Sequence, residues 1–519
     1  MEKMIQSDVR KQIWKMILAA SCSVLSFHQI LTGYYTLQNI LLTLAAAFLC
    51  AYWFATKTWE ENSGYIGQNI RTSVIILILV SCTVWREYQS SAGVRRDSLK
   101  VQMPVNFFRI RWYLFSIVFL WYFAVWLYRR MKDLLQNIWS QLDQLDRKTY
   151  AGLTIALGMI IAFAYLFQPM WYLQYDRVYS VDSGWCFHSI YPQAAYYDIR
   201  HPILSLVTFP VWAVTDSFLS FCAPENLREV LCAVFIQFLN VQLLLFVGLI
   251  LRIITRSRLV FLLYMASFPT MLFSMSLEKY QICIFWLVLY VYQVCKDMDS
   301  PGGTFIMTAG MMPTNGLIGI CELFINRPFL AKMKNIAEIF LHGLAVLVCT
   351  GRVHLLNFVA AYQEIMEMKN SFGGSMTIRE RAISVTKMIQ SSFLALSSDA
   401  SGNYLWRNVT SGVSVLCAVI IVLMIVGAFS NWHIKFVRIA CLWTAFSFVL
   451  FVILNWSPQE SPLFAILFSW ALIPLFQMGV DFLIKKFGMN VKIVYGCIVV
   501  TMLVVNLTAL MDIHRFLYG

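Results

Sequence analysis

Residues 412–430 read GVSVLCAVIIVLMIVGAFS, an unbroken apolar stretch without a single charged side chain. A helix needs about 20 apolar residues to cross a hydrocarbon core of about 30 Å, and this stretch is long enough. Because lipid offers no hydrogen-bond partner to the backbone, such a segment is stable in a bilayer as a helix. The stretch therefore predicts a membrane-spanning helix.

The rest of the chain has the same character. Of its 519 residues, 59% are hydrophobic and 13% are charged, and the mean hydropathy is +0.67. Soluble proteins average about 45–50% apolar and about 25% charged residues. The apolar runs are continuous, whereas the strands of a membrane β-barrel alternate. We therefore predict an all-α, polytopic membrane protein with about 13 to 15 spans and short helices at the outer membrane surface.

The basic residues predict the orientation of the spans. A net charge of +13 would suggest nucleic acid in a soluble protein, but here the basic residues gather in short loops, as cytoplasmic loops do, and no nucleic-acid partner is expected. Placing these loops inside requires that 203–221 stays on the outer face and that 303–325 forms a hairpin. The centre of that hairpin, MTAGMMPTNGLIG at 307–319, is rich in turn residues. The basic segment 86–111 does not fit this orientation, and its side is left open.

The span pattern divides the chain into four parts. They are an added N-terminal module of about four spans at 1–149, a core at 150–350 with a first outer loop at 168–202, a long outer loop at 351–411, and the last spans at 412–519. Within the long loop, residues 378–396 are predicted to form an amphipathic helix at the surface.

The first outer loop carries the most informative polar stretch, YSVDSGWCFHSIYPQAAYYDIRHP at 179–202. Ionisable residues at the membrane are costly and often functional. Asp182 fits a general base or a ligand of a divalent cation such as Mg²⁺ or Mn²⁺, and it equally fits the cap of a helix that begins near Gly184. Arg200 and His201 suit contacts to a phosphate group. Asp176 is interpreted as a capping or solvated residue.

Two more carboxylates fall on the same membrane face in this topology. Glu278 lies in SLEKY and Glu460 lies in SPQESP. Each has an ordinary alternative, because Glu278 can form a solvated ion pair with Lys279 and Glu460 can belong to a polar turn. Asp198 is ambiguous in the same way. Tyr197 belongs to a dense aromatic group that mostly suits an interfacial belt, while some of its members can stack on sugar rings.

The order of these motifs resembles the GT-C superfamily of integral-membrane glycosyltransferases, in its bacterial type, which uses polyprenyl-phosphate sugar donors. The similarity covers residues 150–484. It consists of a span followed by an outer loop with Asp182, then HPILSLVTFPVW from His201, then LILRIITRSR ending at Arg258. The hairpin with PTNG resembles one that often reads TKG in relatives. The corner SPQESPLFAILFSW resembles a bacterial subgroup in which a glutamate opens a late span.

The resemblance implies an inverting sugar transfer on the outer leaflet of a bacterial plasma membrane. Asp182 would be the base, with Glu278 and Glu460 as further catalytic residues that orient the sugar or the acceptor. The implied substrate-binding residues are Tyr197, Asp198, Arg200, His201 and Asn315. The implied acceptor is a glycan, lipid or protein of the cell envelope. Many members carry paired acids where this chain has Asp182 followed by Ser183, so the metal is left undefined.

Two other functions fit the same composition. A polysaccharide polymerase or ligase also handles lipid-linked glycans on the outer face, and it would use arginines of the 351–411 loop. A flippase or transporter of lipid-linked sugars would place ionisable residues within spans and show inverted repeats, and neither is clear in this sequence.

Overall fold

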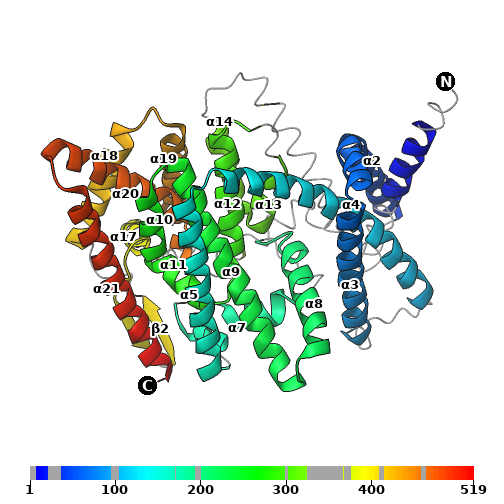
Figure 1. Cartoon of the computed structure of the whole chain (residues 1–519), viewed down its shortest axis with the longest axis horizontal. Helices are drawn as coiled ribbons and strands as arrows, with labels where there is room; N and C mark the ends of the chain where they lie inside the picture. The colour runs from blue at the N-terminus through cyan, green and yellow to red at the C-terminus, as the bar shows by residue number, and fades with distance from the viewer. Residues whose placement is uncertain are drawn as a thin grey trace. The chain divides into compact units, whose positions relative to one another are not determined.

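The computed structural model describes residues 8–20, 37–94, 105–169, 171–179, 181–192, 200–298, 302–323, 333, 366–367, 376–401, 403–407, 414–456 and 463–518. Within these residues the regular structure is helical except for one antiparallel hairpin, β1 (Ser398–Ser401) paired with β2 (Tyr404–Arg407) (Figure 1). The all-α prediction is confirmed for this part of the chain.

Among the described residues, six helices are long and apolar enough to cross a membrane, or up to eight if each of two bent pairs is one span. The six are α5 (Gln144–Phe167), α8 (Ser205–Cys222), α9 (Glu225–Thr255), α19 with its π-helical end (Lys435–Ile453), α20 with a preceding 3-10 turn (Leu463–Phe487) and α21 (Val491–Tyr518). The chain is thus a multi-pass membrane protein. Other expected spans are short helices, such as α12 (Tyr280–Cys295) and α18 (Val415–Ser430), and the span expected at 336–350 lies outside the described residues.

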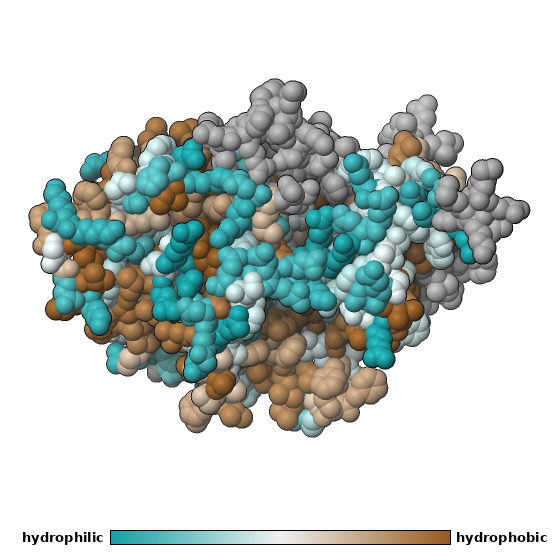
Figure 2. All heavy atoms as spheres, turned by 45° about the horizontal axis from the view of Figure 1, so that its top comes forward, coloured by the Kyte–Doolittle hydropathy of each residue, from teal (hydrophilic) through white to brown (hydrophobic). Residues whose placement is uncertain are grey.

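The chain forms two compact units. Unit 1 comprises Met1–Trp139, Ile190–Phe221 and Pro328–Tyr362, and unit 2 comprises Ser140–Ser189, Cys222–Arg327 and Gln363–Gly519. The division into four parts, with an N-terminal module at 1–149, stays a prediction. Within each unit taken by itself, Figure 2 shows hydrophilic side chains on the face that is turned forward from the top of Figure 1, with apolar side chains below them.

Unit 1 contains α2 (Leu37–Gln68), α3 (Ile70–Val94) and α4 (Val105–Ser140), as well as most of α8. The helices α2 and α3 bend by 107° at their junction. Packing of α4 on α2 centres on Tyr122, whose hydroxyl lies 2.8 Å from Thr58 Oγ1 and whose carbonyl accepts from Asn62. Much of the predicted loop 86–111 is helical, because α3 continues to Val94 and α4 begins at Val105.

Unit 2 begins with helices that run alternately between two ends. At one end, Arg258 Nε, at the start of α10 (Arg258–Ala266), donates to Asp146 in the first turn of α5 at 3.0 Å. At the other end, Tyr172 follows α5, and its hydroxyl donates to Glu229 in the first turns of α9 at 2.6 Å. We call the first the arginine end, marked by Arg252 and Arg258, and the second the acidic end, marked by Asp176, Asp182 and Glu278.

The expected span at 259–276 is broken. Its two parts, α10 and α11 (Phe268–Met275), are bent by 58° at Ser267, where Pro269 begins the second helix. The break at Ser267 and the end of α11 at Met275 both leave carbonyl groups without helical partners, which is costly in lipid. Side chains from neighbouring segments supply the missing donors. They are Asn506 to Ala266 O, Gln281 to Phe273 O, Gln237 to Ser274 O and Trp171 to Met275 O, at 2.8, 2.8, 2.9 and 3.0 Å.

The predicted hairpin at 303–325 is confirmed. It consists of α13 (Gly302–Met311), a 3-10 turn η3 (Pro313–Leu317) and α14 (Ile318–Leu323). Both arms reach Tyr290 of α12, whose ring lies 5.3 Å from the Phe305 ring and whose hydroxyl donates to Glu322 at 2.5 Å. The tip reaches the first turn of α12, where Asn315 Nδ2 donates to Cys283 O at 3.4 Å.

The C-terminal part of unit 2 contains α17 (Ile378–Ser391), α18, α19, α20 and α21. A capping box at Thr377 and Glu380 starts α17, which confirms a helix where an amphipathic one was predicted, although Val385 and Met388 are buried. Glycines let α18 and α20 approach closely, since a Cβ added to Gly427 would lie 2.0 Å from Leu475 O. Such small-residue contacts are typical of helices packed in membranes.

Candidate functional site

Asp182 lies at the acidic end of unit 2, after α6 (Trp171–Gln174) and a 3-10 turn, η1 (Tyr175–Arg177). It immediately precedes the short helix α7 (Ser183–Trp185), but its side chain makes no capping hydrogen bond. The amide of Gly184 instead donates to Asp176 Oδ1 at 2.7 Å. The structure thus gives the capping role to Asp176, and the capping alternative for Asp182 is wrong.

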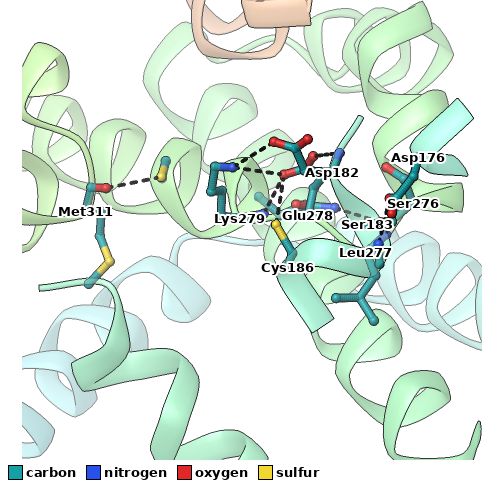
Figure 3. A network of polar contacts seen from close by, with 12 residues as sticks. Asp176, Asp182, Ser183, Cys186, Ser276, Leu277, Glu278, Lys279 and Met311 are labelled. Atoms are coloured by element: carbon teal, nitrogen blue, oxygen red, sulfur yellow. Dashed lines mark hydrogen bonds and ion pairs between the residues drawn. The ribbon is translucent and has the colours of Figure 1, made fainter. Parts of the chain in front are cut away.

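The Asp182 carboxylate is half exposed, with 50% of its side-chain surface accessible. Its Oδ2 lies 3.4 Å from Lys279 Nζ, as Figure 3 shows, and its backbone amide donates to Glu278 Oε1 at 2.5 Å. The two segments 168–202 and 276–280, which the sequence placed on one membrane face, therefore meet. Asp182 has one side open to solvent and the other fixed by the protein.

Glu278 is fully buried, with 0% of its side chain exposed. Its Oε2 accepts from the Lys279 amide at 3.1 Å and from the Cys186 thiol at 3.5 Å. Asn240 Nδ2 donates to the Glu278 carbonyl at 3.2 Å. The solvated ion pair considered from the sequence is wrong, because the side chains of Glu278 and Lys279 are 0% and 5% exposed. Burial raises the pKa of Glu278, Asp182 raises it further, and Lys279 only partly offsets them. In this arrangement Glu278 holds its neighbours in place.

Lys279 is more deeply buried, and has more partners, than its place in the sequence predicted. Its side chain is 5% exposed, and Nζ lies 3.9 Å from Glu278 Oε2 in addition to its contact with Asp182. The ammonium also lies 5.1 Å from the Trp185 ring centre and 5.3 Å from that of Tyr280, within the range of cation–π attraction. Burial opposes the charge, but the surrounding negative groups outweigh it and hold the pKa of Lys279 well above its ordinary value.

The remaining predicted residues are placed less centrally. Asn315 is 1% exposed, and its contact with Cys283 lies about one helical turn beyond Lys279. Arg200 and His201 belong to unit 1, just before α8, where His201 is buried and Arg200 is partly exposed. Tyr197, Asp198 and Glu460 lie outside the described residues.

Other segments of unit 2 support the Asp182 loop at the acidic end. Tyr179, which has a positive φ of 55°, donates its amide to Leu405 O of β2 at 2.9 Å. The Trp171 ring stacks on Tyr518 of α21 at 5.6 Å, and Phe464, just before α20, packs edge-on against Tyr280 at 5.9 Å. A strained backbone conformation persists only when its surroundings enforce it. The end of the long loop and the C-terminal spans thus hold the site loop.

The described residues contain no group of three or more His, Cys, Asp or Glu side chains that could hold a metal ion. What they do contain is a carboxylate aimed partly at solvent, oriented by a buried carboxylate and a buried ammonium at the end of a membrane helix bundle. Such a group can accept a proton from a bound hydroxyl. No family model, curated protein or solved structure matches the chain.

Proposed function

We propose that the protein is an inverting membrane glycosyltransferase that moves a sugar from a polyprenyl-phosphate donor to a hydroxyl of a cell-envelope glycan, lipid or protein. The observation that carries the proposal is the half-exposed Asp182 carboxylate, held by Lys279 while its own amide is held by the buried Glu278. The motif order that resembles GT-C enzymes supports the donor class. The outer face of a bacterial plasma membrane is the proposed location.

In the proposed reaction Asp182 is the general base. The acceptor hydroxyl loses its proton to the carboxylate as its oxygen bonds to the anomeric carbon. The bond between that carbon and the phosphate oxygen breaks, and polyprenyl phosphate leaves with the electron pair. Attack from the opposite side inverts the anomeric configuration. Lys279 orients Asp182 before the reaction, since its ammonium lies 3.4 Å away.

Glu278 has a different role in this proposal from the one expected of it. Because its side chain is fully buried and its oxygens accept from Asp182, Lys279 and Cys186, it is a positioning residue. Arg200 and His201 remain the proposed phosphate contacts, and Tyr197, Asp198, Glu460 and Asn315 remain proposed substrate residues. No step is assigned to Mg²⁺ or Mn²⁺.

The test uses purified protein in lipid nanodiscs with a panel of labelled polyprenyl-phosphate monosaccharides. We expect transfer to an acceptor, or slow release of sugar to water, with inverted configuration. Asp182→Asn should lower the rate by about 100-fold or more, the usual contribution of a general base. The matched control is Glu229→Gln, which alters another part-exposed carboxylate at the acidic end. Undiminished transfer by well-folded Asp182→Asn would refute the assignment of the base.

The same material separates the alternatives. In sealed vesicles, a flippase would move the labelled lipid across the bilayer without breaking the sugar–phosphate bond. A polymerase would lengthen a lipid-linked glycan and would leave single-sugar donors intact. Either outcome would replace the proposed function.

A further inference from the structure

Asp176 packs directly against the helix that follows Asp182. Its Oδ1 accepts from the Gly184 amide at 2.7 Å. A Cβ added to Gly184 would lie 2.5 Å from Asp176 Oδ2, so only glycine fits here without displacing the carboxylate. The carboxylate thus covers the N-terminal amides of α7 from a separate turn of the chain.

A helix that begins directly after an aspartate is normally capped by that aspartate, whose side chain accepts from the first free amides. Asp182 occupies this position but makes no such bond. Instead its carboxylate lies beside Lys279 and is half exposed. Asp176 therefore satisfies the amides that Asp182 would otherwise satisfy, and Asp182 remains available for chemistry.

The charges around Asp176 make this cap sensitive to protons. Burial raises the pKa of Asp176 to about 6, and the nearby carboxylates Asp182 and Glu278 add to the shift, although the Gly184 and Trp185 amides oppose it. Burial raises the pKa of the Tyr172 hydroxyl, which donates to Glu229, and the charge of Asp176 adds slightly to that shift. The cations near the site are engaged elsewhere: Lys279 with Asp182 and Glu278, and Arg177 with Asn403 O and the Phe516 ring.

We infer that Asp176 is a positioning residue that holds the α7 cap in place of Asp182, and that loss of its charge lets Asp182 turn back onto the cap and leave Lys279. The activity consequence rests on the proposed function, because a capped Asp182 no longer faces an acceptor hydroxyl. The replacement of Asp176 by Asp182 as the cap of α7 needs no substrate, so it can be measured in the protein alone. Acidification would therefore switch the site off while the fold stays intact.

The first test does not depend on activity. Lys279 is acetylated at fixed pH 7.5 and its modification is followed by mass spectrometry, since an unpaired lysine has a lower pKa and reacts faster. Asp182→Asn sets the rate for a Lys279 that has lost Asp182 and keeps only Glu278 as a carboxylate partner. We expect Asp176→Ala to match this faster rate and Glu229→Gln to match the wild type. A wild-type rate in folded Asp176→Ala would overturn the cap exchange.

The second test measures sugar transfer against pH. Wild-type kcat should fall as the pH drops through about 6, with KM nearly unchanged. Asp176→Ala should lose about 100-fold in kcat at pH 7.5, the effect of misplacing a reacting group by about 1 Å. Asp176→Asn lacks the charge and keeps one acceptor for the Gly184 amide, as the protonated wild type does, so its kcat should equal that of the acidified wild type and should not change further near pH 6. It also replaces the alanine variant if that one fails to fold.

The two tests fail in distinguishable ways. Faster Lys279 acetylation in Asp176→Ala without any sugar transfer by the wild type would support the cap exchange and refute the proposed function. Sugar transfer whose pH profile is the same in wild type and Asp176→Asn would refute the role of Asp176 and leave the proposed function standing.

Discussion

The two ends of unit 2 both bring carboxylates and cations together, but in different ratios. At the arginine end, Asp143 and Asp146 pair with Arg252 and Arg258, for example Arg252 to Asp146 at 2.8 Å. The same two aspartates form a capping box that starts α5. At the acidic end, Asp182 and Glu278 lie beside Lys279, which among described residues is the only cation within ion-pair distance of either, and Asp176 is close enough to these two carboxylates for them to raise its pKa.

The pKa shifts follow this difference. At the arginine end the Asp146 amide, helped by Arg258 and Arg252, lowers the pKa of Asp143. At the acidic end burial raises the pKa of both Asp176 and Glu278. The two aspartates and two arginines of the arginine end, together with the capping box, hold helices together, and we assign no chemistry to them. An excess of carboxylates near one ammonium, with Glu278 fully buried among them, is costly for the fold, and groups with pKa values shifted in this way are typical of functional sites.

The largest loss of stability and of activity is expected from breaking the buried pair of Glu278 and Lys279. Glu278→Gln leaves Lys279 buried with only Asp182 as a negative partner, and removing one member of a buried pair costs about 3–5 kcal/mol. We expect a large fall in the thermal midpoint, measured in nanodiscs, and loss of transfer. The control is a double-mutant cycle with Lys279→Met. A double variant that loses as much stability as the two single variants combined would contradict direct pairing.

A smaller loss of stability is expected when Asn506, which bonds to the break between α10 and α11, is replaced. Its amide donates to Ala266 O and Phe393 O at 2.8 Å and accepts from the Ala395 amide at 2.9 Å, and it is fully buried. Asn506→Ala removes all three bonds, although Phe393 O keeps the Phe268 amide as a donor at 3.2 Å, and should destabilise the protein by about 2–3 kcal/mol. Thr508→Ala is the control, because its exposed hydroxyl bonds only within its own helix, and it should unfold like the wild type.

Acid should affect stability and activity in opposite directions through Asp176. Its folded-state pKa of about 6 lies above its ordinary value, so the folded chain binds this proton more tightly than the unfolded chain. The resulting stabilisation is fully present at low pH and is lost as the pH rises through about 6. On lowering the pH from about 7 to about 5, the wild type should gain thermal stability relative to Asp176→Asn while its transfer rate falls. Equal thermal midpoint changes in both proteins would contradict the shifted pKa.

The smallest effect is expected at the arginine end. Asp143 is exposed to solvent, and exposed ion pairs contribute little and are screened by salt. Asp143→Asn should shift the thermal midpoint by less than about 2 °C, and the shift should shrink further at high salt. A shift as large as that of Glu278→Gln would remove the contrast between the two ends.

Local patterns in the sequence predicted part of the fold and part of the candidate site. Apolar runs predicted the helices, the turn residues around Asn315 predicted the hairpin, and alternating span directions predicted that Asp182 and Glu278 share one face. The bend at Ser267 and the burial of Lys279 depend on partners far along the chain. Asn506, for example, lies 240 residues from Ala266, the carbonyl it satisfies. A capping role was among the roles predicted for Asp176, but which helix it caps was not predicted, since the favoured cap of α7 by sequence position is Asp182.

The most direct test of the central claim compares the two ends in one assay. Sugar transfer from a polyprenyl-phosphate donor is measured for Asp182→Asn and Asp143→Asn, each confirmed as folded in nanodiscs. If the acidic end carries the chemistry, Asp182→Asn loses about 100-fold or more in rate while Asp143→Asn stays within about twofold of the wild type. Equal rates for the two variants would contradict the account.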